Sequence, residues 1–170
     1  MPSMENWEQS NWWKYLDDSL RDLMRQSKDL ISVENRRLSN EGGEVYHDYA
    51  FTVFSAAKAY EGFLKKVFLD LGLINRAQFS GEHFRIGRAL SPTLPKRYRV
   101  GWVYGKLVEY CKGEELPMAM WEVWKKARNR TFHYFPYHQE AVGLLEAKEL
   151  VEEVASVMEK TVRIFGLPRS

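Results

Sequence analysis

The chain of 170 residues contains a single cysteine, Cys111. One thiol excludes an internal disulfide framework and a cysteine-rich zinc site, and it favours a reducing compartment. Histidine is also scarce, because the four histidines include no two at the spacing of one helical turn and so form a poor ligand set. We therefore expect no metal site and no cofactor.

Long apolar runs are missing as well. No stretch approaches the ~20 residues that a membrane-spanning helix needs. The first residues, Met-Pro-Ser-Met-Glu-Asn-Trp-Glu, lack the basic and then apolar segments of a secretion signal. Charge is nearly balanced, with 25 Lys+Arg against 23 Asp+Glu, so any basic surface must be local. These features predict a cytoplasmic protein of one domain, residues 1–170, with no membrane contact.

Helical spacing is present through most of the chain. Apolar residues at steps of three and four predict helices over about 11–38, 45–71, 100–112, 117–135 and 140–165. Glycines and prolines interrupt residues 73–99, where a short helix near 82–90 is expected. No segment shows the alternation of apolar and polar residues that is typical of a strand. The prediction is an all-α, up-and-down bundle of four or five helices.

The helix expected over 45–71 has an unusually wide apolar face, which predicts a central place in the bundle. It consists of one stripe and an adjacent one: Tyr49, Val53, Ala56, Tyr60, Phe63 and Val67, then Ala50, Phe54, Ala57, Leu64 and Phe68. Glu61 lies at the edge of this face, within about 20° of Ala50 on the helical wheel. A carboxylate there is unfavourable unless it is paired. Both a structural ion pair with Lys58 or Lys65 and a functional acid are compatible with this position.

A second feature is the run Lys-Lys-Ala-Arg-Asn-Arg-Thr-Phe-His that ends at His133. Arginine donors match phosphate oxygens, and histidine can transfer protons near neutral pH. Together they could cleave an RNA phosphodiester without a metal. A solvated basic helix end explains the same residues. Arg128 and His133 lie about 140° apart on an ideal helix, so convergence needs a bent helix end, the reach of arginine or a second chain.

The segment from Arg128 to His133 resembles the signature of HEPN-domain ribonucleases, which is Arg, a polar residue, three more residues and His. The stretch 47–65, followed by Leu-Gly-Leu-Ile at 71–74, resembles the RNase LS-like branch with its RnlA/LsoA toxins. The resemblance covers about residues 45–135. Those toxins carry other domains before the HEPN unit, for which this chain leaves little room. The resemblance implies a HEPN-like bundle and a metal-independent endoribonuclease, a toxin or defence component that acts as a homodimer.

The resemblance also implies roles for individual residues. His133 would be the general acid and base, Arg128 would hold the scissile phosphate, Asn129 would orient the site, and Glu61 would position Arg128 or His133. Basic residues expected to contact RNA are Lys58, Lys65, Lys125, Arg130, Arg85 and Arg88. Expected partners are RNA, a second copy of the chain, and a cognate antitoxin or a nucleotidyltransferase.

Two other functions fit the same sequence. The chain could be a non-catalytic HEPN-like module that binds a nucleotide, RNA or a partner protein without cleaving anything. It could also be a dimeric scaffold whose basic segments only improve solubility. The first alternative predicts that Arg128 and His133 do not face a common cleft.

Overall fold

The computed structural model describes residues 4–40, 42–133 and 141–168, apart from the side chains of residues 4, 5, 40, 129 and 130. The described part is mostly helical and contains no strand, which confirms the predicted all-α class. Within it, no helix is both long enough and apolar enough to cross a bilayer. The α-helices are α1 (Asn11–Tyr15), α2 (Asp18–Asn40), α3 (Ala50–Asp70), α4 (Arg76–Ser80), α5 (Ile86–Leu90), α6 (Tyr104–Cys111), α7 (Glu115–Trp124) and α8 (Leu144–Phe165).

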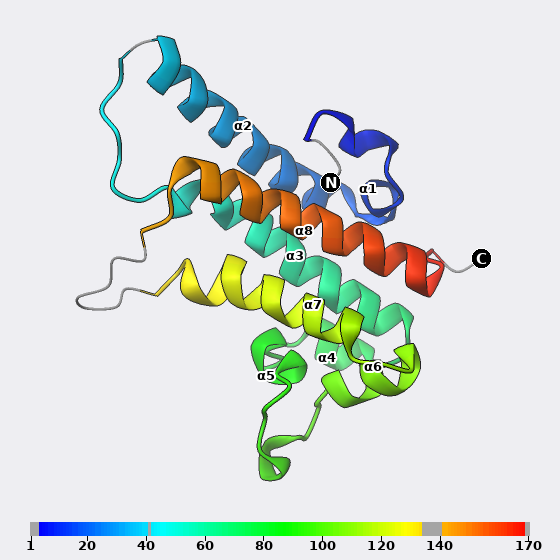
Figure 1. Ribbon diagram of the computed structural model, residues 1–170. Helices are drawn as coiled ribbons and strands as arrows, with labels where there is room; N and C mark the ends of the chain where they lie inside the picture. Colours follow the sequence, from blue (N-terminus) through cyan, green and yellow to red (C-terminus); the bar gives the residue numbers. More distant parts are fainter. Residues whose placement is uncertain (1–3, 41, 134–140, 169–170) are drawn as a thin grey trace.

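Three further helical segments complete the described structure. Two are 3-10 helices, Met4–Gln9 and Lys96–Tyr98. The third is a π-helical segment, Lys125–Arg130, which continues α7 directly because Lys125 keeps helical angles (φ −62°, ψ −45°). In Figure 1 the four long helices α2, α3, α7 and α8 alternate in direction along the chain, as the sequence predicted for an up-and-down bundle.

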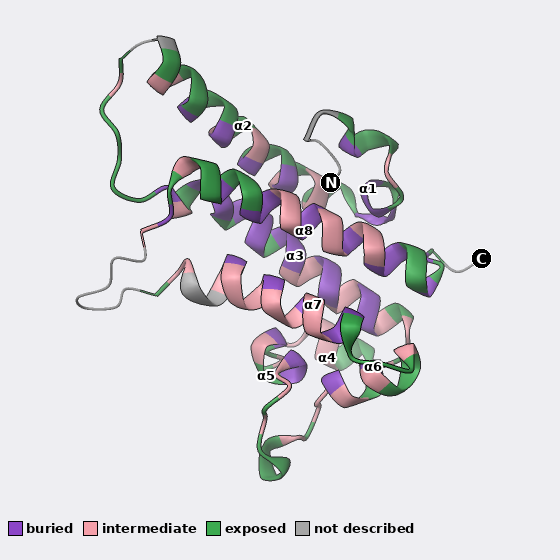
Figure 2. Ribbon diagram, in the orientation of Figure 1, coloured by how far each residue is buried: buried purple, intermediate pink, exposed green. Residues whose placement is uncertain are grey.

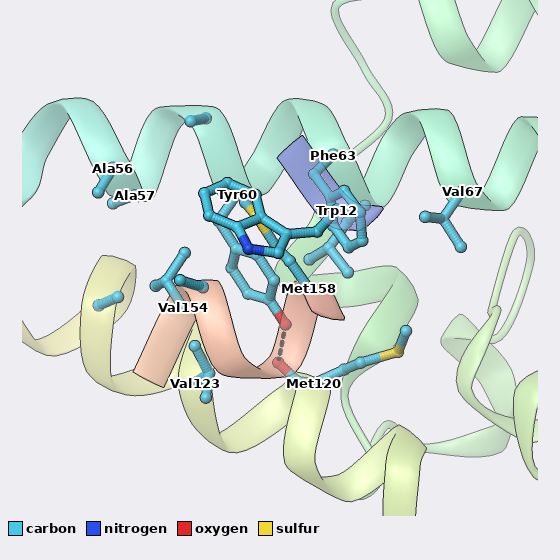
Figure 3. Close-up of a cluster of buried hydrophobic side chains, with 14 of the residues drawn as sticks. Trp12, Ala56, Ala57, Tyr60, Phe63, Val67, Met120, Val123, Val154 and Met158 are labelled. Carbon is cyan, nitrogen blue, oxygen red and sulfur yellow. Dashed lines mark hydrogen bonds between the residues drawn. The ribbon is translucent and has the colours of Figure 1, made fainter. Parts of the chain in front are cut away.

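Helix α3 is the centre of the bundle, because α2, α7 and α8 all pack against it. Figure 2 shows α3 largely in the colour of buried residues. Every residue of the first predicted stripe is buried, from Tyr49 to Val67. In the core, the Tyr60 hydroxyl donates a hydrogen bond of 3.1 Å to the Met120 carbonyl oxygen, which joins α3 to α7 (Figure 3).

The single helix expected over residues 11–38 is wrong, since the chain breaks between α1 and α2. Leu16 adopts an extended conformation (ψ 144°) while its side chain stays buried. The break lets α1 turn toward α8, where the Glu159 carboxylate accepts a hydrogen bond of 3.1 Å from the Trp12 amide. Trp12 is thereby placed in the core next to α3 and α8 (Figure 3). Leu16 keeps the apolar period, so its spacing does not reveal the break.

Other helix boundaries differ from the predicted ones at their ends. Helix α3 begins at Ala50 rather than near 45, because the Tyr49 amide is hydrogen-bonded to the Val142 carbonyl at 2.8 Å. The short helix expected near 82–90 is α5, and α4 precedes it with Asn75 as a side-chain cap. Helix α6 ends at Cys111, and Lys112, with its left-handed backbone (φ 52°), caps it in place of the expected Gly113.

The Tyr60 hydrogen bond provides a test of how α3 and α7 are held together. Tyr60→Phe should lower the free energy of unfolding by about 1 kcal/mol, because it leaves the ring in place and removes one buried hydrogen bond. Chemical denaturation measures this change. Tyr98→Phe is the matched control, since Tyr98 is 44% exposed and water can replace its contacts. Equal losses in the two variants would contradict the assignment.

Candidate functional site

A single strip of α3 reaches solvent beside α2 and the π-helical segment. Phe54, Lys58, Glu61 and Lys65 follow one another along it at steps of three and four residues. This strip forms one side of a cavity of about 660 Å³. Residues from three parts of the chain line the cavity: Ser19, Leu20 and Leu23 from α2, Phe54, Lys58, Glu61, Gly62 and Lys65 from α3, and Arg128 and Phe132 from the π-helical segment and the turn after it.

Within this cavity the Arg128 Nε atom lies 3.8 Å from the Glu61 Oε2 atom. The two side chains are 42% and 35% exposed, respectively. At this distance the pair is an ion pair rather than a hydrogen bond. Because both groups contact water, their attraction contributes at most about 1 kcal/mol to stability. The packing of the helices therefore positions the two side chains, and their attraction contributes little to the stability of the fold.

One aromatic ring lies against Arg128, and a second ring contacts the first. The guanidinium carbon of Arg128 lies 4.8 Å from the centre of the Phe132 ring, within the range of a cation–π contact. Phe132 in turn meets Phe54 edge to face, with ring centres 5.1 Å apart and planes at 72°. Phe54 is 50% exposed, unlike the buried rings of Tyr60, Phe63 and Phe68 on the same helix. These contacts restrict the orientation of the guanidinium.

The backbone around Arg128 is not an ideal α-helix. In a π-helix the backbone hydrogen bonds join residues that are five apart rather than four, so each turn is wider than in an α-helix. The Thr131 hydroxyl follows this pattern and donates a hydrogen bond of 2.7 Å to the Lys126 carbonyl, five residues earlier. The Lys126 Nζ atom lies 3.1 and 3.0 Å from the two carboxylate oxygens of Glu153, which ties the segment to α8. The separation of about 140° expected for Arg128 and His133 does not apply to this geometry.

Four of the predicted site residues meet in this cavity: Lys58, Glu61, Lys65 and Arg128. His133 is exposed, three residues beyond the π-helical segment, and it lies outside the cavity lining.

The side chains of Asn129 and Arg130 lie outside the described part of the structure. The expected roles of these two residues therefore stay predictions.

The remaining predicted RNA contacts lie elsewhere. Lys125 pairs with Glu122 on its own helix, at 2.7 Å between Nζ and Oε2. Arg85 and Arg88 line a second cavity of about 420 Å³ beside α4 and α5, which His83 also lines. Arg88 donates two hydrogen bonds to the Tyr98 carbonyl, at 3.3 and 3.0 Å. This second basic area is separate from the Glu61–Arg128 cavity in its lining residues.

No group of three or more His, Cys, Asp or Glu side chains suited to holding a metal ion occurs among the described residues. Cys111 is partly exposed, and burial raises the pKa of its thiol. A raised pKa leaves less of the reactive thiolate near neutral pH. Neither a metal-binding group nor a reactive thiol is therefore indicated by the described residues.

The sequence did not identify Phe54 and Phe132 as site residues. Both match the apolar period of their helices, and that period predicted core positions for them. The available signal was the place of Phe54 in the second apolar stripe of its helix, on the side next to Glu61. Periodicity does not show whether a neighbouring helix covers that stripe.

Comparisons with protein-family models, with curated proteins and with solved structures gave no match to this chain.

The Thr131 hydrogen bond should stabilise the end of the π-helical segment. Thr131→Ala should lower the free energy of unfolding by about 1 kcal/mol, because the Lys126 carbonyl loses its hydroxyl donor. Thr131→Ser keeps that donor and is the matched control. Thermal and chemical denaturation of both variants give the comparison, and a serine variant as unstable as the alanine variant would argue against this role.

Proposed function

We propose that this protein is a metal-independent endoribonuclease that cleaves RNA at the Glu61–Arg128 cavity with His133 as the proton-transfer group. The observation that carries the proposal is the meeting of Arg128, Glu61 and two lysines in one cavity, although they come from two helices far apart in the sequence. The sequence resemblance to RNase LS-like HEPN ribonucleases supports the same residues. A role as a toxin or defence component rests on that resemblance alone.

The chemistry follows from the functional groups. His133, as the base, takes the proton of a ribose 2′-hydroxyl, and the 2′-oxygen attacks the adjacent phosphorus. The bond from phosphorus to the 5′-oxygen breaks, and an acid returns a proton to that oxygen. The products are a 2′,3′-cyclic phosphate and a free 5′-hydroxyl. Arg128 neutralises charge that builds up on the phosphate oxygens, and Glu61 positions Arg128.

One imidazole cannot be base and acid at the same moment. We propose that the protein acts as a homodimer in which each protomer contributes a copy of His133 to a common cleft. One copy would then remove the 2′-hydroxyl proton while the other protonates the leaving oxygen. The exposure of His133 and of Arg128 is compatible with such a shared cleft.

Substitution of the histidine is the direct test of cleavage. His133→Ala should slow cleavage of single-stranded RNA by about 100-fold or more when a chelator is present, the usual scale for loss of a general acid or base. The assay is gel electrophoresis of end-labelled RNA, with circular dichroism to verify folding. His47→Ala is the matched control, because His47 is also exposed but precedes α3, far along the chain from Arg128 and the π-helical segment. Unchanged cleavage by the His133 variant would remove His133 from this role.

A second candidate function is an RNA- or nucleotide-binding module without cleavage. The position of His133 outside the cavity lining favours it, because the described residues that line the cavity offer cations and a carboxylate but no imidazole. In this case the wild-type protein should bind RNA and leave it intact in the assay above.

Lysines that contact phosphate should make binding depend on salt. Lys58→Ala and Lys65→Ala should each reduce the slope of log affinity against log salt concentration by about 0.7, the amount expected for one contact to a single strand. Fluorescence anisotropy with a labelled single-stranded RNA at several salt concentrations measures the slopes. Lys148→Ala, an exposed lysine on α8 outside the cavity, serves as the control. Slopes that match the control for both cavity lysines would exclude direct phosphate contact.

A further inference from the structure

The two sides of the Glu61–Arg128 cavity differ in chemistry. Among the described residues, its charged side carries three cations, Lys58, Lys65 and Arg128, against one carboxylate, Glu61. Its apolar side consists of side chains from α2, α3 and the segment after α7: Leu20, Leu23, Phe54 and Phe132. A ligand that complements both sides has an anionic part and a flat apolar part. A nucleotide has both, in its phosphate and its base.

The size of the cavity agrees with such a ligand. Its volume of about 660 Å³ lies within the range of about 300–1,000 Å³ that is typical of small-molecule sites. The net positive charge of the lining favours an anionic ligand over a neutral one. A base within a duplex keeps its faces against its neighbours, whereas an unpaired base can leave the stack and enter a pocket.

Phe54 is the ring best suited to receive the base. Phe54 and Phe132 meet edge to face, an arrangement that covers at most one of their four ring faces. Arg128 already lies over the Phe132 ring. Phe54 is half exposed although it sits on the central helix, so its ring contributes less to the core than its position in the apolar stripe suggests.

We propose that this cavity is a base-stacking subsite for single-stranded RNA, in which one unpaired base stacks on Phe54 while Lys58 and Lys65 contact the flanking phosphates. This inference rests on the proposed interaction with RNA, and it concerns binding rather than cleavage. It assigns the protein a preference for unpaired over paired RNA. No base identity follows from stacking, because every base has an aromatic face.

The test uses a labelled single-stranded RNA whose 2′-hydroxyls are methylated, which prevents cleavage while binding is measured. Phe54→Leu keeps an apolar side chain and removes the ring. It should weaken binding about tenfold, the loss expected for one stacked base. Phe54→Trp should bind as well as the wild type or better. Phe51→Leu is the matched control, because Phe51 is 43% exposed on the same helix but lies outside the cavity.

Two further probes separate stacking from a general loss of affinity. The first is the same strand with its bases removed, for which Phe54→Leu and the wild type should have equal affinities. The second is the corresponding duplex, which the wild type should bind more weakly than the single strand. Equal effects of the Phe54 and Phe51 substitutions, an equal loss with the base-free strand, or tighter binding of the duplex would overturn the proposal.

The outcome is independent of whether the protein cleaves RNA. If RNA stays intact in the chelator assay but Phe54→Leu selectively weakens binding to base-containing strands, the endonuclease proposal fails and the subsite stands. If RNA is cleaved and the Phe54 variant binds like the Phe51 variant, the subsite fails and the endonuclease stands.

Discussion

The burial of α3 on most of its sides is the constraint on which the rest of the structure depends. Because α2, α7 and α8 pack against it together, only a narrow strip remains in contact with water. The charged residues Lys58, Glu61 and Lys65 lie on that strip, where their charges stay hydrated. The packing of the bundle therefore determines where polar chemistry can occur on its central helix.

Contacts between other residues of the helices hold Arg128 beside this strip. The Tyr60–Met120 hydrogen bond joins α3 to α7, and the contact of Lys126 with Glu153 joins the π-helical segment to α8. These connections determine the relative positions of Glu61 and Arg128, whose own attraction across 3.8 Å is weak. Because the interhelical contacts fix the helices, Arg128 can leave Glu61 for another anion without loss of the fold.

The period of the apolar residues predicts more of the framework than of the site. Helix α3 and its first buried stripe follow from spacing alone, and so does the position of Glu61 at the edge of the apolar face. The break at Leu16 and the exposure of Phe54 do not follow, because both residues match the helical period and only the neighbouring helices decide their surroundings. The spacing of apolar residues does not predict the π-helical segment either. That segment depends on tertiary contacts and on the Thr131 hydrogen bond rather than on a repeating pattern.

The geometry of Glu61 and Arg128 meets two opposing requirements of the proposed phosphate site. A carboxylate near an arginine orients it, but a direct hydrogen-bonded pair would use the donors that a phosphate needs. At 3.8 Å the carboxylate attracts the guanidinium without a hydrogen bond to Nε. A phosphate that entered the cavity, as proposed, would displace water and strengthen its own attraction to Arg128, because charges interact more strongly where water is excluded. The half-exposed pair is thus better suited to reversible binding of an anion than a buried, fully hydrogen-bonded pair would be.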